Sequence, residues 1–172
     1  MSFQSMKNKI LSKTRFLFFL ILLLPEISQA QSFAYKAMLS GLYDSDFPVL
    51  KPDQIQDLGS FQVLDAREKH EYEVSHLAQA KWVGYDTFSL QNLTSLEKNK
   101  PVLIYCTVGA RSQEIGKKLK AAGFSQVYNL YGGIIHWANE GRPVYHQGKI
   151  TNRIHTYSQP WGIWLKKGEK VY

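Results

Sequence analysis

Hydrophobic residues along the chain fall into short, uninterrupted runs that are separated by stretches with helical spacing. Four runs predict strands, near Phe61–Leu64, Lys81–Val83, Val102–Tyr105 and Val127–Leu130. Continuous apolar runs of about four to eight residues are typical of strands that are buried on both faces. The alternation of such runs with helical stretches predicts an α/β fold, in which a parallel sheet carries helices on both faces.

The third run, from Pro101 to Cys106, leads directly into a predicted helix. The residues after it pass through Gly109 and then take up helical spacing as far as Gly123, which we expect to end the helix. Cys106 therefore lies at the carboxyl end of a buried strand, on a loop that enters a helix. Open α/β sheets place their sites in the crevice beyond this edge.

The first thirty residues do not follow this pattern and have the features of an export signal. Four basic residues precede the apolar run Phe16–Leu24, and Pro25 ends the run ahead of the small-residue pattern Ser28–Ala30. The alternative is a transmembrane anchor, but the run is far shorter than the roughly 20 residues that cross a bilayer. We expect cleavage after Ala30, no stable membrane anchor, and a periplasmic or secreted mature protein.

The remaining length suits one domain with a normal core. We expect an N-terminal extension over residues 31–48 that packs on the domain, the domain itself over 49–145, and a basic, aromatic C-terminal extension over 146–172. The net charge of +7 comes from the two ends of the chain, because residues 142–172 carry six basic side chains and only Glu169 as an acid. The body of the chain has no basic stripe, so we expect no nucleic-acid partner.

The C-terminal extension mixes tryptophans and tyrosines with lysines. We favour the interpretation in which Trp161 and Trp164 pack on the surface of their own domain while the lysines stay in solvent. The alternative is that the extension binds a partner protein with an acidic surface, or a membrane surface.

Cys106 is the only cysteine, although exported proteins normally use cysteines in pairs. One interpretation is purely structural: Cys106 serves as a small buried hydrophobic residue at the end of the strand. A helix N-terminus beside it would instead favour an anion such as a thiolate. Gly109 permits a tight backbone cradle, and Arg111 adds a positive charge. Ser112 could cap the helix or donate to a bound anion, and we favour capping.

Three segments resemble, in order, the motifs of the rhodanese-like domain family. CTVGARS, from Cys106 to Ser112, resembles the active-site loop of the rhodanese-like sulfurtransferases: a cysteine, a glycine three positions later, then an arginine and a serine. VLDAREKHEYEVSHLAQA, from Val63 to Ala80, resembles the family's first strand, Asp-x-Arg-Glu turn and acidic-aromatic helix. VYNLYGGIIHWANEGRPV, from Val127 to Val144, resembles its closing strand, double glycine and tryptophan helix. The chain is too short for the family's tandem two-domain form.

The resemblance implies a sulfurtransferase or persulfide carrier. Cys106 would take sulfur from thiosulfate, polysulfide or a protein persulfide and pass it to a thiol or cyanide in two steps. Arg111 would attract the anionic donor. The loop residues expected to hold the persulfide are Thr107, Val108, Gly109, Ala110 and Arg111. Members associated with thiosulfate often carry further cations in this loop, so we expect thiosulfate to be a poor donor here.

Asp65 and Arg67 follow the first long strand and are predicted to lie near the same crevice. They could contact the substrate or form a salt bridge that fixes the loop, and the same two alternatives hold for Glu68 and Glu71. His76 is expected to be structural.

Two other functions would use the same scaffold. One is a binding or redox-sensing module without turnover, and the other is an arsenate reductase or phosphatase. Phosphate-handling relatives have one residue more between the cysteine and the arginine than this chain has between Cys106 and Arg111. No cofactor is expected, and the single cysteine and dispersed histidines lack the spacing of a metal site.

Overall fold

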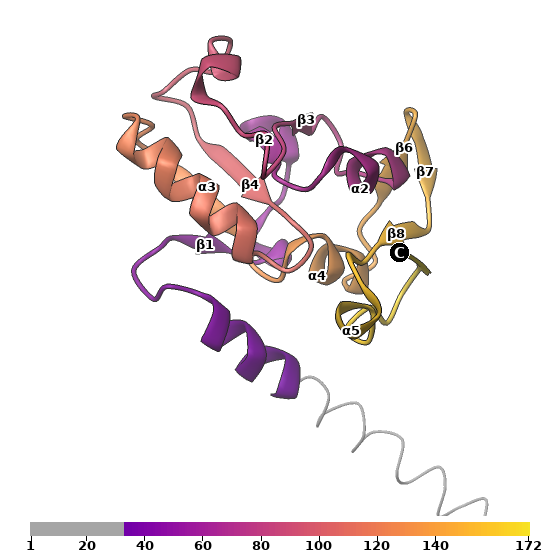
Figure 1. Ribbon diagram of the computed structural model, residues 1–172. Coiled ribbons are helices and arrows are strands. Elements are labelled where there is room, and N and C mark those ends of the chain that lie inside the picture. The colour runs from indigo at the N-terminus through magenta and orange to yellow at the C-terminus, as the bar shows by residue number, and fades with distance from the viewer. Residues whose placement is uncertain (1–32) are drawn as a thin grey trace, which may run out of the picture. The chain divides into compact units, whose positions relative to one another are not determined.

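Five parallel strands form the central sheet, in the order β1-β5-β4-β2-β3 (Figure 1). They are β1 (Val49–Leu50), β2 (Gln62–Asp65), β3 (Lys81–Trp82), β4 (Val102–Tyr105) and β5 (Val127–Leu130). Every neighbouring pair is parallel. The predicted parallel sheet is therefore confirmed, and β4 and β5 have the predicted bounds.

The computed structural model describes residues 33–172, and the predicted signal and its cleavage site after Ala30 lie outside these residues. Residues 39–172 form one unit, and residues before Leu39 belong to another. The packing of residues 31–48 as a whole therefore stays a prediction. Within residues 33–172, no helix is both long enough and apolar enough to span a membrane.

Helices lie on both faces of the sheet (Figure 1). The main ones are α2 (Lys69–Val74), α3 (Ala110–Ala121) and α4 (Gly133–Asn139); short 3₁₀ turns form η1 (Pro52–Gln54), η2 (Leu58–Ser60) and η3 (Leu90–Leu93). All four residues of β4 are buried, and their side chains alternate between the two faces. Ile104 packs in the cluster that contains Ile115 of α3, whereas the Tyr105 hydroxyl accepts the Leu77 N–H at 3.1 Å. Helix α3 on one face and the segment that follows α2 on the other thus cover the central strand.

The helix after Cys106 has the predicted ends. Gly109 precedes it with a φ of 107°, and Gly123 follows it with a φ of 92°. Both angles lie in the left-handed region that glycine adopts most easily. These two glycines therefore direct the chain into and out of α3.

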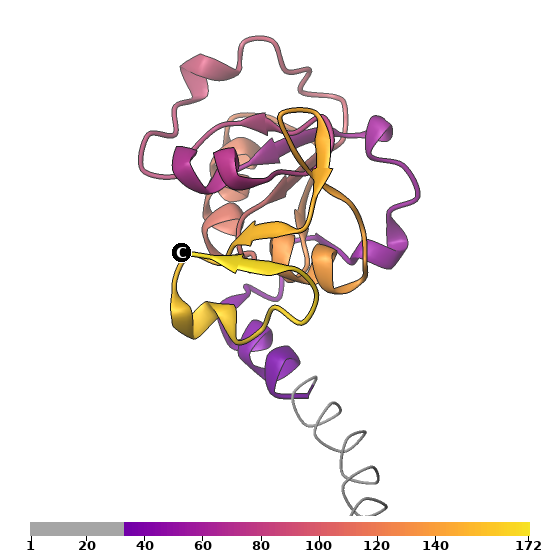
Figure 2. The same cartoon turned by 90° about the vertical axis from the view of Figure 1, so that its right-hand side faces the viewer.

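The C-terminal extension is folded rather than a loose tail. It contains β7 (Lys149–Thr151), which forms a hairpin with β6 (Val144–His146) across the predicted boundary at residue 146. It also contains a parallel pair, β8 (Arg153–His155) and β9 (Glu169–Val171), on either side of α5 (Gln159–Gly162). Figure 2 shows the yellow segment folding back against the domain, where β8 packs on α2. The extension thus reaches the carboxyl edge of the sheet.

The aromatic and basic residues of the extension differ in their exposure to solvent. Trp161 and Trp164 are half-buried, whereas Lys166, Lys167 and Lys170 are exposed. The Asn139 side chain ties the segment down, since its amide donates to the Trp164 carbonyl at 2.9 Å and its oxygen accepts the Lys166 N–H at 2.7 Å. This division agrees with the favoured interpretation of the tail.

Candidate active site

Cys106 directly follows β4, at the carboxyl edge of the sheet. Its side chain is buried, and Sγ accepts the backbone N–H of Gly109 at 3.1 Å. The left-handed conformation of Gly109 turns the chain back so that this N–H points at the sulfur. The loop therefore turns back so that a backbone N–H donates to the sulfur atom.

Helix α3 begins immediately beyond this loop, at Ala110. The N–H groups of a helix's first turn have no acceptor within the helix, and the helix dipole places positive partial charge there. A thiolate or persulfide anion on Cys106 would gain hydrogen bonds and favourable electrostatics from this arrangement. The backbone of the loop can supply both without any particular side chain.

Arg111 forms a bidentate ion pair with Glu71 of α2. Arg111 Nη1 lies 2.7 Å from Glu71 Oε2, and Nη2 lies 2.9 Å from Oε1. The Thr107 hydroxyl donates to Glu71 Oε1 at 3.0 Å, so the carboxylate holds two residues of the Cys106 loop. Arg111 was expected to attract an anionic donor, but Glu71 already balances its charge. The arginine's clearest role is to position the loop.

The electrostatics of Glu71 follow from this pairing. Burial alone raises the pKa of Glu71, but the hydrogen bonds and positive charge of Arg111 outweigh that effect and lower the pKa below its ordinary value. Glu71 is therefore an ionised carboxylate at neutral pH, with its side chain fully buried.

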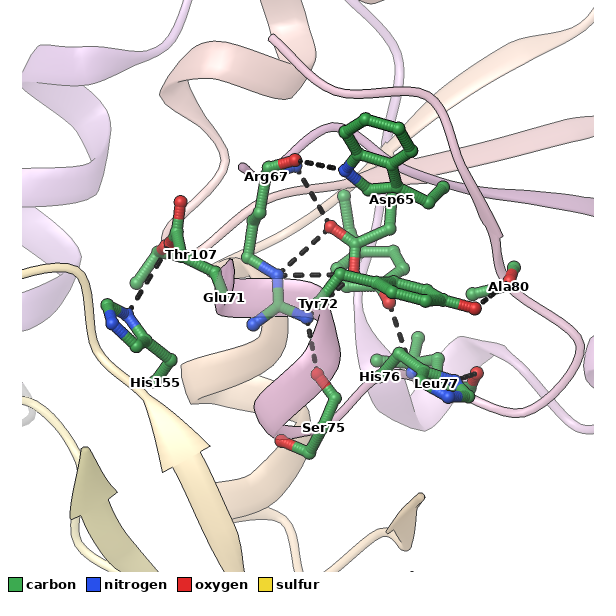
Figure 3. A network of polar contacts seen from close by, with 12 residues as sticks. Asp65, Arg67, Glu71, Tyr72, Ser75, His76, Leu77, Ala80, Thr107 and His155 are labelled. Carbon is green, nitrogen blue, oxygen red and sulfur yellow. Dashed lines mark hydrogen bonds and ion pairs between the residues drawn. The ribbon is translucent and has the colours of Figure 1, made fainter. Parts of the chain in front are cut away.

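Asp65 and Arg67 form a second ion pair beside the first, in which both side chains are completely buried. Arg67 Nη2 lies 2.6 Å from Asp65 Oδ2 and donates to the Ser75 carbonyl at 2.6 Å (Figure 3). Neither residue lines the pocket at Cys106. Of the two alternatives for this pair, the structure favours the salt bridge that fixes backbone geometry over substrate contact.

Ser112 has neither of its two predicted roles. Its buried hydroxyl donates to Asn129 Oδ1 at 2.8 Å, and the Asn129 amide donates to the Gly109 carbonyl at 2.9 Å. Because the helix cap is Gly109, the serine side chain is directed into the sheet instead. Ser112 and Asn129 thus hold the loop from the side of β5. In the sequence, this role was indicated by Asn129, the polar residue within the otherwise apolar run of β5.

Two further residues of the site were not identified from the sequence. The Tyr43 hydroxyl donates to the Val108 carbonyl at 2.6 Å and accepts the Gly132 N–H at 2.7 Å. Gly133 lies so close to the loop that a Cβ there would collide with the carbonyl oxygens of Cys106 and Thr107. The close approach lets the Ile134 N–H donate to the Cys106 carbonyl at 2.9 Å.

Changing Tyr43 to phenylalanine is expected to lower the free energy of unfolding by about 1–2 kcal/mol. The ring stays, but the Val108 carbonyl and the Gly132 N–H lose their shared partner. Urea unfolding measures the change. Tyr128→Phe on β5 is the matched control, since no hydrogen bond of its hydroxyl is seen in the described part of the chain; equal losses in both variants would contradict the bridging role.

A pocket of about 150 Å³ opens at Cys106. Its lining residues are Cys106, Thr107, Val108, Ala110, Arg111, Tyr157 and Trp161. The structure therefore brings Cys106 and the predicted loop residues other than Gly109 together around one cavity. It adds two aromatic residues of the C-terminal extension: Trp161, for which the sequence predicted packing on the domain surface, and Tyr157, for which it predicted no position.

The histidines near the site have structural surroundings. His76 Nδ1 lies 3.0 Å from the Leu77 carbonyl, and its ring stacks on Tyr72. His155 accepts the Tyr157 N–H at Nδ1, 3.1 Å away, and burial lowers the pKa of His155. Within residues 33–172, no group of three or more His, Cys, Asp or Glu side chains is placed to hold a metal ion.

Comparison with known proteins agrees with this geometry. The sequence profile described as "Rhodanese-like domain" matches residues 52–140. The tRNA uridine(34) hydroxylase of Enterobacter sp. (strain 638) is 36% identical over 95 residues, which are 50% of this chain and 27% of that protein. The enzyme of the same name from Sodalis glossinidius is 35% identical over 104 residues, covering 58% of this chain and 30% of that protein. The chain thus spans less than a third of the length of these relatives.

Solved structures show the same fold. The thiosulfate sulfurtransferase of Pseudomonas aeruginosa aligns with a TM-score of 0.53 and 25% identity, over 69% of this chain and 23% of that one. A rhodanese-like domain protein of Staphylococcus aureus aligns with a TM-score of 0.51 and 26% identity, over 59% of this chain and 99% of that one. The family profile ends at residue 140, so the whole C-terminal extension, residues 146–172, lies beyond it.

Proposed function

Because the chain belongs to the rhodanese-like domain family, we propose that it is a sulfurtransferase or persulfide carrier whose sulfur is held on Cys106. The observation that carries the proposal is the position of Cys106 Sγ. It lies in a pocket at the start of α3 and accepts the Gly109 N–H. This is the environment that a thiolate nucleophile and its persulfide anion require.

The reaction proceeds in two steps. The Cys106 thiolate attacks the outer sulfur of the donor, so that an S–S bond forms at Cys106 while the donor's own bond to that sulfur breaks. With thiosulfate the leaving group is sulfite; with an organic persulfide it is a thiolate. An acceptor thiolate or cyanide then attacks the outer sulfur of Cys106–S–S⁻ and restores the Cys106 thiolate. No external oxidant or reductant is consumed.

The loop geometry favours catalysed sulfur transfer over a function in which the fold serves only as a binding module. A module that only binds a partner needs neither an N–H directed at the sulfur nor an arginine held from another helix. A redox-sensing thiol would use the same contacts, so gain and loss of a sulfur atom is what separates sulfur transfer from sensing. The arsenate reductase or phosphatase alternative is disfavoured by the loop between Cys106 and Arg111, which is one residue shorter than in phosphate-handling relatives. Sulfur transfer therefore remains the leading proposal.

The hydroxylase activity in the names of the matched relatives is not part of this proposal. The similarity covers 27% of the Enterobacter protein, so that name describes a much longer chain. The two chains are similar over 95 residues only.

Intact mass spectrometry of purified residues 31–172 tests the proposal. After incubation with thiosulfate, and separately with polysulfide, we expect one added sulfur atom that cyanide or a small thiol removes. Cys106→Ser is the control and is expected to gain none. If the wild-type thiol stays free with every donor tried, the enzymatic proposal is wrong and the binding module becomes the better explanation.

Export is a further part of the proposal and rests on the sequence of residues 1–30 alone. The expected product is a chain that starts at Gln31 and is found in the periplasm or the medium. N-terminal sequencing after cell fractionation checks this. A full-length chain that starts at Met1 and stays in the cytoplasm would contradict it.

A partner protein that binds the C-terminal extension also remains a proposal. Lys166, Lys167 and Lys170 are exposed there and would suit an acidic surface that presents the acceptor thiol. Crosslinking of the full chain with and without these three charges would test it.

A further inference from the structure

The pocket at Cys106 has two walls of different origin. One wall is the loop from Cys106 to Arg111, within the segment that the family profile matches. The other consists of Tyr157 and Trp161, which lie beyond residue 140, where that match ends. The C-terminal extension therefore completes a cavity whose reactive atom belongs to the domain.

Tyr157 is held over the site by its backbone. Its φ is 69°, in the left-handed region that a bulky side chain rarely adopts. Two hydrogen bonds maintain this turn: the Tyr157 N–H donates to His155 Nδ1 at 3.1 Å, and the Ser158 N–H donates to the Thr156 carbonyl at 2.8 Å. Strained backbone persists only where its surroundings impose it, and it concentrates at functional sites.

The extension is also linked to the residues that brace the loop. The Tyr157 ring lies over the Arg111 guanidinium, 4.9 Å from Cζ to the ring centre. His155 Nδ1 lies 3.9 Å from Glu71 Oε1, and the His155 ring contacts the His70 ring edge-on. These contacts fix the aromatic wall relative to Arg111.

The charge of the pocket limits the anion that it can accept. Arg111 is the one charged side chain among the lining residues, and both of its terminal nitrogens are bound to Glu71. A dianion would therefore meet an ion pair, the helix N-terminus and two aromatic rings, without an unpaired cation. A monoanion with an apolar group would use the backbone N–H groups for its charge and the rings for its apolar part.

We infer that Tyr157 and Trp161 are specificity-determining residues that bind the organic group of a singly charged sulfur donor. The inference rests on the proposed persulfide chemistry and names the donor class: an organic persulfide or thiosulfonate with an apolar, preferably aromatic, substituent. For a thiosulfonate, the Cys106 thiolate takes the terminal sulfur and the organic sulfinate leaves. The S–S bond of the donor breaks as the S–S bond of Cys106–S–S⁻ forms, so charge and atoms balance.

Three donors separate charge from apolar contact. Benzenethiosulfonate and methanethiosulfonate are both monoanions and differ in the ring, whereas thiosulfate is a dianion without an organic group. With cyanide as acceptor, we expect kcat/KM to be highest for benzenethiosulfonate, by about tenfold over methanethiosulfonate. Because the donors also differ in intrinsic reactivity, each rate is divided by the rate of the same donor with a free small-molecule thiol.

Variants of the extension assign the preference to its residues. Tyr157→Ala and Trp161→Ala are each expected to reduce the preference for the phenyl over the methyl donor by about fivefold or more, mainly through KM. Trp161→Phe keeps an aromatic ring and should retain most of the preference for the phenyl donor. Tyr172→Ala is the matched control, since Tyr172 lies in the same extension, is exposed to 56% against 55% for Tyr157, and does not line the pocket.

The outcomes distinguish this inference from the proposed function. If Cys106 gains sulfur from all donors but the corrected phenyl preference is absent, or is unchanged in Tyr157→Ala and Trp161→Ala, the aromatic wall does not select the donor and the inference is overturned. If no donor forms a persulfide on the wild-type protein, the proposed function itself fails. Thermal unfolding of each variant shows that a lost preference does not come from a lost fold.

Discussion

Replacing Asp65 with alanine is expected to lower the free energy of unfolding by about 3–5 kcal/mol, because it leaves the buried guanidinium of Arg67 without its counter-charge. Both side chains of this pair are completely inaccessible to solvent. Water cannot reach the arginine to replace the lost carboxylate, so the cost of burying a charge is no longer compensated. Urea denaturation measures the change.

A surface pair of the same length provides the control. Lys100 Nζ lies 2.6 Å from Glu97 Oε1, the same distance as in the Arg67–Asp65 pair, but these side chains are 60% and 57% exposed. Glu97→Ala is expected to cost less than about 1 kcal/mol, since water and salt screen exposed charges. Similar losses in Asp65→Ala and Glu97→Ala would show that burial does not decide the energy of the pair.

A double variant separates the lost pair from the stranded charge. Asp65→Leu with Arg67→Leu removes both charges, and we expect it to be more stable than Asp65→Leu alone. Arg67 also donates from its side chain to the Ser75 carbonyl, and its own carbonyl accepts the Trp82 indole N–H at 2.8 Å. These contacts limit how far the backbone at Arg67 can adjust in the variants. A double variant less stable than the single one would mean that the arginine's other hydrogen bonds outweigh its unpaired charge.

Replacing Glu71 with glutamine is expected to slow persulfide formation on Cys106 by at least about tenfold. The carboxylate accepts from Thr107, from both terminal nitrogens of Arg111 and from the Glu68 N–H. A glutamine has one acceptor oxygen, and its NH₂ would face donors that it cannot satisfy. The loop would then lose the contacts that hold Thr107 and Arg111 on either side of the Gly109 N–H, which donates to the sulfur. Single-turnover mass spectrometry measures the rate.

The control for this variant is Glu73→Gln, on the same helix. The Glu73 side chain is 61% exposed, and its carboxylate forms a 3.8 Å surface pair with Lys69. The Glu73 contact with His146 is made by the backbone carbonyl and is kept in the variant, so persulfide formation should be unchanged. If Glu71→Gln forms the persulfide as fast as the wild type, Arg111 and the loop are positioned without Glu71.

The pH dependence of stability supplies a second readout for Glu71. Its pKa is lowered in the folded protein, so the pairing contributes stability above its ordinary pKa of 4.5 and loses it as the pH falls through the lowered value. The stability difference between the wild type and Glu71→Gln should therefore be constant near neutral pH and shrink in acid. A difference that grows as the pH falls below 4.5 would contradict the sign of this shift.

The sequence alone determined the features that depend on neighbouring residues. The apolar run before Cys106 indicated the buried strand β4, and Gly109 and Gly123 indicated where α3 begins and ends. Local patterns suffice for these features because strand burial, helix spacing and left-handed turns are properties of short segments. The order of three motifs also identified the family, which the profile over residues 52–140 confirms.

The tertiary structure alone decided how the site is braced and closed. Glu71 and Arg111 are separated by 40 positions, and Tyr43 and Val108 by 65, so neither contact leaves a pattern in a single sequence. The same holds for Tyr157 and Trp161, whose position beside Cys106 depends on the docking of β8 against α2. For Trp161 the sequence predicted only packing on the domain surface. Long-range contacts depend on how all elements pack together, and their free energy is therefore a property of the whole fold rather than of any local segment.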